Sequence, residues 1–130
     1  MNTKYLMMAS AIFMGILGLA CTFLPKEMLD YVNLTATTLP ALFIQITGAL
    51  YLGFALMNWT AKTVLIGKIY AKPLSLGNFL HFTMAAITFT KAAFHDPNST
   101  YIIIAAVAYS IFAVLFGIVL FTNPAKIKGA

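Results

Sequence analysis

The residues of this sequence that could do chemistry are concentrated in one mostly apolar stretch, residues 78–95, which reads NFLHFTMAAITFTKAAFH. A histidine such as His81 can bind a ligand or handle protons, because its ordinary pKa lies near neutrality. Lys91 can bind an anionic or carbonyl group. Together with polar residues elsewhere in the chain, they form a set of candidates for ligand binding or for polar contacts between helices: Ser10, Gln45, Asn58, Asn78, His81, Thr88 and Lys91.

Each candidate also has a purely structural interpretation. A polar side chain in a membrane can hydrogen-bond across helices, which stabilises the pair by about 0.6 kcal/mol on average. Lys91 is near the end of its apolar segment and can extend its ammonium group to the interface. The sequence alone leaves the functional and the structural interpretations open.

The composition sets the environment in which these residues must act. Of 130 residues, 62% are hydrophobic and 8% are charged, with a mean hydropathy of +0.92. Soluble domains carry about 25% charged residues, so this chain has too few charges to cover a water-exposed surface. The composition therefore predicts an all-α integral membrane protein.

Four segments are long and apolar enough to be predicted spans, since a span needs roughly 20 such residues. They are residues 5–24, 40–58, 76–94 and 101–122. Pro25 ends the first segment, and Pro40 suits the first turn of the second. We expect the first span to be retained, and we expect one transmembrane domain over residues 1–130, folded as a four-helix bundle.

The lysines predict the orientation, because lysines in short loops favour the cytoplasmic side. Lys4, the three lysines between spans two and three, and the two lysines after span four would lie inside if both termini are cytoplasmic. Only Lys26 and Lys91 would lie outside. The connection at residues 60–75 mixes lysines with apolar residues, which predicts an element on the inner leaflet, either an anchor or a site for lipid or partner recognition.

Helical periodicity predicts which faces meet. In residues 78–95, His81, Thr88 and Lys91 share one flank, and most of the bulky residues, Phe82 among them, share the other. We expect the polar flank to face the bundle and the phenylalanines to face lipid. Small residues beside Gln45 on span two, and the Gly15–Gly18 pair on span one, predict close helix approach.

Depth in the membrane predicts two polar clusters. Ser10, Asn58, Asn78 and His81 fall towards the inner side, whereas Gln45, Thr88 and Lys91 fall towards the outer side. His81 and His95 are about 21 Å apart along a helix at 1.5 Å per residue. One metal ion therefore cannot bind both, and no metal site is predicted.

Several function classes are disfavoured. Neither Asp nor Glu lies within a span, which argues against a proton-coupled multidrug exporter, and the absence of arginine argues against a glutathione-dependent enzyme. One cysteine excludes an intrachain disulfide, and one buried histidine does not supply two haem ligands. No catalytic motif appears, and lysines spread over membrane flanks do not indicate nucleic-acid binding.

The signature GALYLGFALMNW at 48–59, followed by GKIYAKPLSLGNFLHF at 67–82, resembles the DoxX-like group of small bacterial membrane proteins. The resemblance implies four helices in the bacterial cytoplasmic (inner) membrane. Some relatives are linked to quinone-dependent sulfur oxidation beside a soluble partner, but no quinone pocket is identified here. The resemblance draws attention to six positions: Gly48, Gly53, Asn58, Trp59, Asn78 and His81.

Three functions remain open. The chain could be a redox-accessory subunit associated with a quinone, with His81 hydrogen-bonding a carbonyl headgroup. It could be a structural or assembly subunit without catalytic chemistry, as a homo-oligomer or in a larger membrane complex. It could instead be an oligomeric carrier or channel, with Gln45, His81 and Lys91 lining a polar path.

Overall fold

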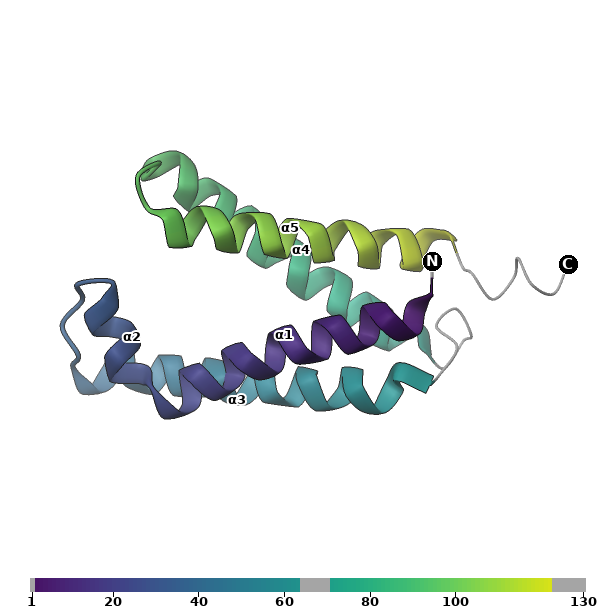
Figure 1. Ribbon diagram of the computed structural model, residues 1–130, viewed down its shortest axis with the longest axis horizontal. Coiled ribbons are helices and arrows are strands. Elements are labelled where there is room, and N and C mark those ends of the chain that lie inside the picture. Colours follow the sequence, from purple (N-terminus) through teal and green to yellow (C-terminus); the bar gives the residue numbers. More distant parts are fainter. Residues whose placement is uncertain (1, 64–70, 123–130) are drawn as a thin grey trace, which may run out of the picture. The chain divides into compact units, whose positions relative to one another are not determined.

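The computed structural model describes residues 2–63 and 71–122, and these are helical without any strand. The described residues fall into two compact units, one on each side of the segment 64–70. Figure 1 shows the helices of both units. In chain order they are α1 (Thr3–Phe23), α2 (Pro25–Tyr31), α3 (Thr38–Thr60), the 3₁₀ turn η1 (Ala61–Thr63), α4 (Lys72–His95) and α5 (Thr100–Thr122).

Three stretches of the described chain are long and apolar enough to cross a membrane. They are α1, α3 together with η1, and α5. This confirms the prediction of a multi-pass membrane protein. Helix α4 is not among the three, because Asn78, His81 and Lys91 lower its hydropathy, so four crossings are not established by length and composition.

Helix ends follow local sequence signals. Asn2 caps α1 by accepting a hydrogen bond from the Lys4 backbone N–H at 3.1 Å, as short polar side chains do at helix starts. Pro73 lies in the first turn of α4, which begins at Lys72 rather than at the predicted residue 76. The rest of the predicted inner-leaflet connection, at residues 64–70, lies outside the described residues.

The short helix α2 was not predicted. Pro25 occupies its first turn and needs no backbone partner there. The chain leaves α2 through Asn33, whose φ of 58° places it in the left-handed region that asparagine tolerates. The Leu34 N–H then donates to the Leu29 carbonyl at 2.9 Å, which closes the end of the helix.

In the first unit, α1 and α3 run antiparallel and pack closely along their length (Figure 1). Glycines make this approach possible. A Cβ atom added at Gly18 would lie 2.9 Å from the Leu52 backbone nitrogen, and one at Gly48 would lie 2.8 Å from the Thr22 backbone nitrogen. Small residues therefore bring the two backbones together, as predicted from Gly18 and Gly48.

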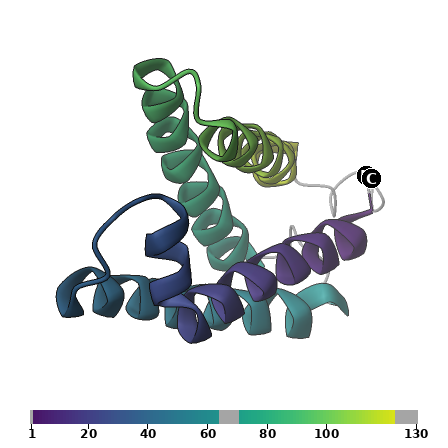
Figure 2. The same ribbon diagram turned by 60° about the vertical axis from the view of Figure 1, so that its left-hand side comes forward.

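In the second unit, α4 and α5 form a hairpin (Figure 2) whose core is aromatic. Phe82 is fully buried, and its ring stacks on Phe112 and Phe116 at centroid distances of 4.8 and 5.5 Å. Further ring pairs extend along the hairpin, from Phe79–Phe121 to Phe89–Tyr109. Aromatic stacking, rather than small residues, therefore holds this pair of helices.

The prediction that the bulky flank of residues 78–95 faces lipid is wrong at Phe82. Phe82 packs on α5, whereas Leu80, Ile87 and Phe94 of the same flank are exposed, as are Thr88 and Lys91 of the other flank. The buried residues of α4 are Ser75, Asn78, Phe82 and Ala86. The Phe82 ring is buried because it stacks on Phe112 and Phe116 of α5, and the Thr88 hydroxyl can be exposed because it donates to its own helix.

Candidate functional site

One predicted polar contact is present in the first unit. Asn58 on α3 donates a hydrogen bond from Nδ2 to the Ser10 hydroxyl oxygen on α1 at 3.0 Å, and both residues are fully buried. The Ser10 hydroxyl in turn donates to the Met7 carbonyl at 3.0 Å. This chain of bonds ties α3 to the α1 backbone and fixes the register of the two helices.

In the second unit, Asn78 and His81 lie on α4 one turn apart. Asn78 is fully buried and donates to the Leu74 carbonyl at 3.0 Å. His81 is half-buried among aromatic rings, with its centroid 5.2 Å from that of Phe82 and 5.9 Å from that of Tyr109. Both side chains thus contribute to the packing of their own hairpin.

Of the predicted outer cluster, Thr88 and Lys91 belong to the second unit and Gln45 belongs to the first. The Thr88 hydroxyl is exposed and donates to the Met84 carbonyl of its own helix at 2.8 Å. Such a bond to the preceding turn satisfies a threonine hydroxyl within the helix. Lys91 is exposed as well. Contacts between the inner polar residues of the two units, and between Gln45 and Lys91, stay predictions.

Gln45 is exposed on the first unit, where it lines a cleft of about 330 Å³. Lys26 of α2 and Thr37 and Thr38 at the start of α3 line the same cleft. Sequence reasoning placed Gln45 among small residues of span two. Gly48 of that set packs on α1, whereas Gln45 itself is exposed.

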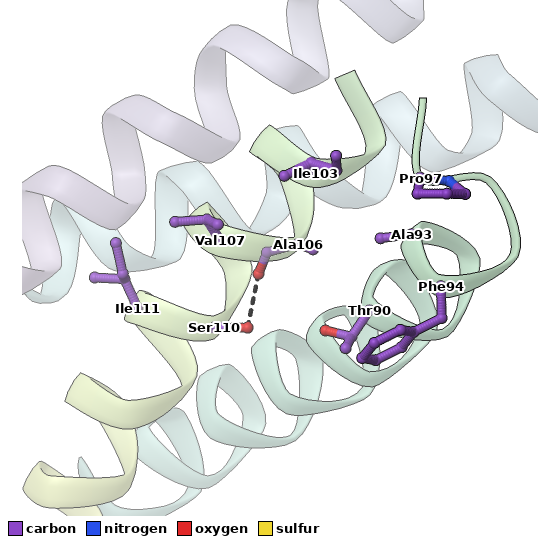
Figure 3. Close-up of a pocket in the computed structure, with 9 residues that line it drawn as sticks. All are labelled: Thr90, Ala93, Phe94, Pro97, Ile103, Ala106, Val107, Ser110 and Ile111. Carbon is purple, nitrogen blue, oxygen red and sulfur yellow. Dashed lines mark hydrogen bonds between the residues drawn. The ribbon is translucent and has the colours of Figure 1, made fainter. Parts of the chain in front are cut away.

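An apolar groove of about 510 Å³ lies between the end of α4 and the first half of α5 (Figure 3). Among the described residues that line it, Thr90 and Ser110 are polar, and the Ser110 hydroxyl donates to the Ala106 carbonyl at 2.7 Å. Its apolar wall comprises Ala93, Phe94, Pro97, Ile103, Ala106, Val107 and Ile111. None of the predicted site residues lines this groove, so a quinone headgroup here would not meet His81.

A second apolar groove, of about 340 Å³, lies between α1 and α3. It is lined by Ala11, Ile12, Gly15, Leu19, Leu52, Ala55, Leu56 and Trp59. At its Trp59 end, the Lys62 ammonium lies 3.5 Å from the centroid of the indole ring. Sequence reasoning drew attention to Trp59 and placed the lysines of residues 60–75 at the inner leaflet, but it did not identify the groove, because a groove depends on how two helices pack.

In residues 2–63 and 71–122, no three potential metal ligands come together. The two histidines are too far apart along α4 for one ion, as the spacing predicted.

Neither family models, nor curated proteins, nor solved structures yield a match to this chain. The DoxX-like resemblance therefore depends on the signature residues alone.

Proposed function

We propose that the chain is a four-span protein of the bacterial cytoplasmic membrane that serves as an accessory or assembly subunit and has no catalytic chemistry of its own. The observation that carries the proposal is the use of the buried polar groups. Asn58 and Ser10 join α3 to the backbone of α1, and Asn78 bonds to its own helix. Within the first unit the Ser10–Asn58 bond holds two helices together, and within the second unit the Asn78 bond satisfies a buried amide.

The packing of α4 supports a fourth crossing. Ring contacts between α4 and α5 are distributed from Phe79–Phe121 at one end to Phe89–Tyr109 towards the other. With 24 residues, α4 is about 36 Å long at 1.5 Å per residue, which exceeds the hydrocarbon thickness of about 30 Å. Because α5 is apolar enough to span, a helix packed along it would cross with it.

The charges support cytoplasmic termini. Four crossings put Lys4, the lysines between α3 and α4, and the two lysines after α5 on one side. If α4 did not cross, the lysines between α3 and α4 and the two lysines after α5 would be on opposite sides of the membrane, which the preference for cytoplasmic lysines disfavours. The resemblance over residues 48–82 agrees with a DoxX-like arrangement of this kind.

Exposed apolar side chains on both units leave room for partners. Examples are Leu50 and Leu56 on α3, and Val107 and Val114 on α5. In a membrane, lipid or protein can cover such faces equally well, so we propose contacts with further copies or with a larger membrane complex.

The test is the state of the full chain in mild detergent. We expect it to be extracted as a complex whose protein mass exceeds the 14.1 kDa of one chain. That complex should contain a fixed number of copies of this chain or the same partner proteins in every preparation. His81→Ala and Gln45→Ala should leave that complex unchanged. A monomer that transports solute into liposomes, with flux abolished by Lys91→Ala or Gln45→Ala, would instead identify a carrier and contradict the proposal.

A further inference from the structure

The groove between α1 and α3 has the form of an acyl-chain site. Its floor is small, because Gly15 has no side chain and Ala55 has only a methyl group, with their Cβ positions 3.7 Å apart. Its flanks are large aliphatic side chains, several of them exposed: Ile12, Leu19, Leu52 and Leu56. From Leu52 to Trp59 the groove follows α3 for about 10 Å at 1.5 Å per residue.

A cation lies at one end of this groove. Lys62 places its ammonium group 3.5 Å from the centroid of the Trp59 ring, and Trp59 itself lines the groove. Tryptophan is enriched at the level of lipid headgroups. The groove therefore begins at the interface and extends inwards by less than half of the hydrocarbon thickness of about 30 Å.

The chemistry at the two ends differs in a way that matches one class of molecule. The Lys62 end suits a negative charge, and the Leu19 and Leu52 end suits a hydrocarbon chain. We infer that this groove binds an anionic phospholipid, with one acyl chain between α1 and α3 and the phosphate beside the Lys62 ammonium. The inference concerns a site that the proposed subunit function does not use, and it can hold if that function is wrong.

The chain offers a built-in probe, because Trp59 is its single tryptophan. The full-length protein is reconstituted in vesicles of phosphatidylcholine and phosphatidylglycerol at a fixed ratio. Bromine, which quenches indole fluorescence, is placed on the acyl chains of one lipid or of the other. We expect brominated phosphatidylglycerol to quench Trp59 more strongly than brominated phosphatidylcholine does.

Lys62→Gln should remove this selectivity. A basic residue near an anionic membrane surface strengthens binding by about fivefold, so the variant should bring the ratio of the two lipids' apparent affinities to about one. Lys26→Gln is the matched control, because Lys26 is exposed beyond the opposite end of α1, and it should retain the selectivity. Each variant is measured against its own unquenched fluorescence.

A second pair of variants tests the acyl-chain part of the site. Ile12→Phe should fill the groove and reduce quenching by both brominated lipids. Leu50→Phe, at an exposed position of α3 that does not line the groove, should not. Equal quenching by the two lipids in the unmodified protein, or selectivity that survives Lys62→Gln, would overturn the inference. Absence of quenching by either lipid would also overturn it, since protein rather than lipid would then cover the groove.

Discussion

Replacing Gly48 by alanine should weaken the α1–α3 pair through a clash that the helices cannot avoid by rotating a side chain. The added Cβ would lie 2.5 Å from the Thr22 hydroxyl oxygen, 2.8 Å from the Thr22 backbone nitrogen and 2.9 Å from the Cys21 Cβ. The hydroxyl can turn away, but the backbone of α1 must move. Overpacking of this kind costs about 1–3 kcal/mol.

The same substitution also has a favourable effect, because alanine is preferred over glycine inside a helix by about 1 kcal/mol. Gly53→Ala is the matched control, since it lies in the same helix and its added Cβ would have no other atom within 4 Å. The free energy of unfolding is measured by titrating the protein in mild detergent with dodecyl sulfate and following helix content by circular dichroism. Gly48→Ala should be less stable than Gly53→Ala by about 1–3 kcal/mol. Equal stability of the two variants would refute the close approach of α1 and α3.

Two further predictions concern the polar bond and the aromatic core. A double-mutant cycle of Ser10→Ala and Asn58→Ala should give a coupling free energy of about 0.6 kcal/mol, and no more than about 1.7 kcal/mol. The reason is that the two side chains share one hydrogen bond. If the losses in free energy of unfolding are additive in the same titration, that contact is contradicted. Phe82→Ala should destabilise the second unit by about 3–5 kcal/mol, because its ring is fully buried, whereas Phe94→Ala at an 83% exposed position should change the unfolding midpoint little. Similar midpoints for these two phenylalanine variants would argue against an aromatic core around position 82.

The positions of the long helices could be predicted because a lipid environment requires long apolar segments. The predicted first, second and fourth spans agree with α1, α3 and α5 to within two residues at each end. Their ends are marked by Pro25, Pro40 and the turn at residues 96–99. The close approach at Gly18 and Gly48 was also predictable, since small residues on one face of a membrane helix allow backbone contact. The Ser10–Asn58 bond follows from the same register, which puts both residues at one depth.

The orientation of α4 could not be predicted from its own periodicity. A helical wheel separates a polar flank from a bulky one, but it does not show which flank a neighbouring helix covers. Phe82 is buried because α5 presents Phe112 and Phe116 at matching heights. Thr88 bonds to its own backbone and can therefore be exposed. The grooves were not predictable either, because each is formed by side chains of two helices.

Cysteine accessibility tests directly whether α4 crosses the membrane beside α5. Cys21 is replaced by serine, and single cysteines are introduced by Thr35→Cys, Thr63→Cys and Asn98→Cys, all at exposed positions. In intact spheroplasts, a membrane-impermeant maleimide should label the chain at positions 35 and 98, and at position 63 only after permeabilisation. Labelling at position 98 only after permeabilisation, with position 35 still accessible from outside, would contradict the fourth crossing and the cytoplasmic placement of both termini.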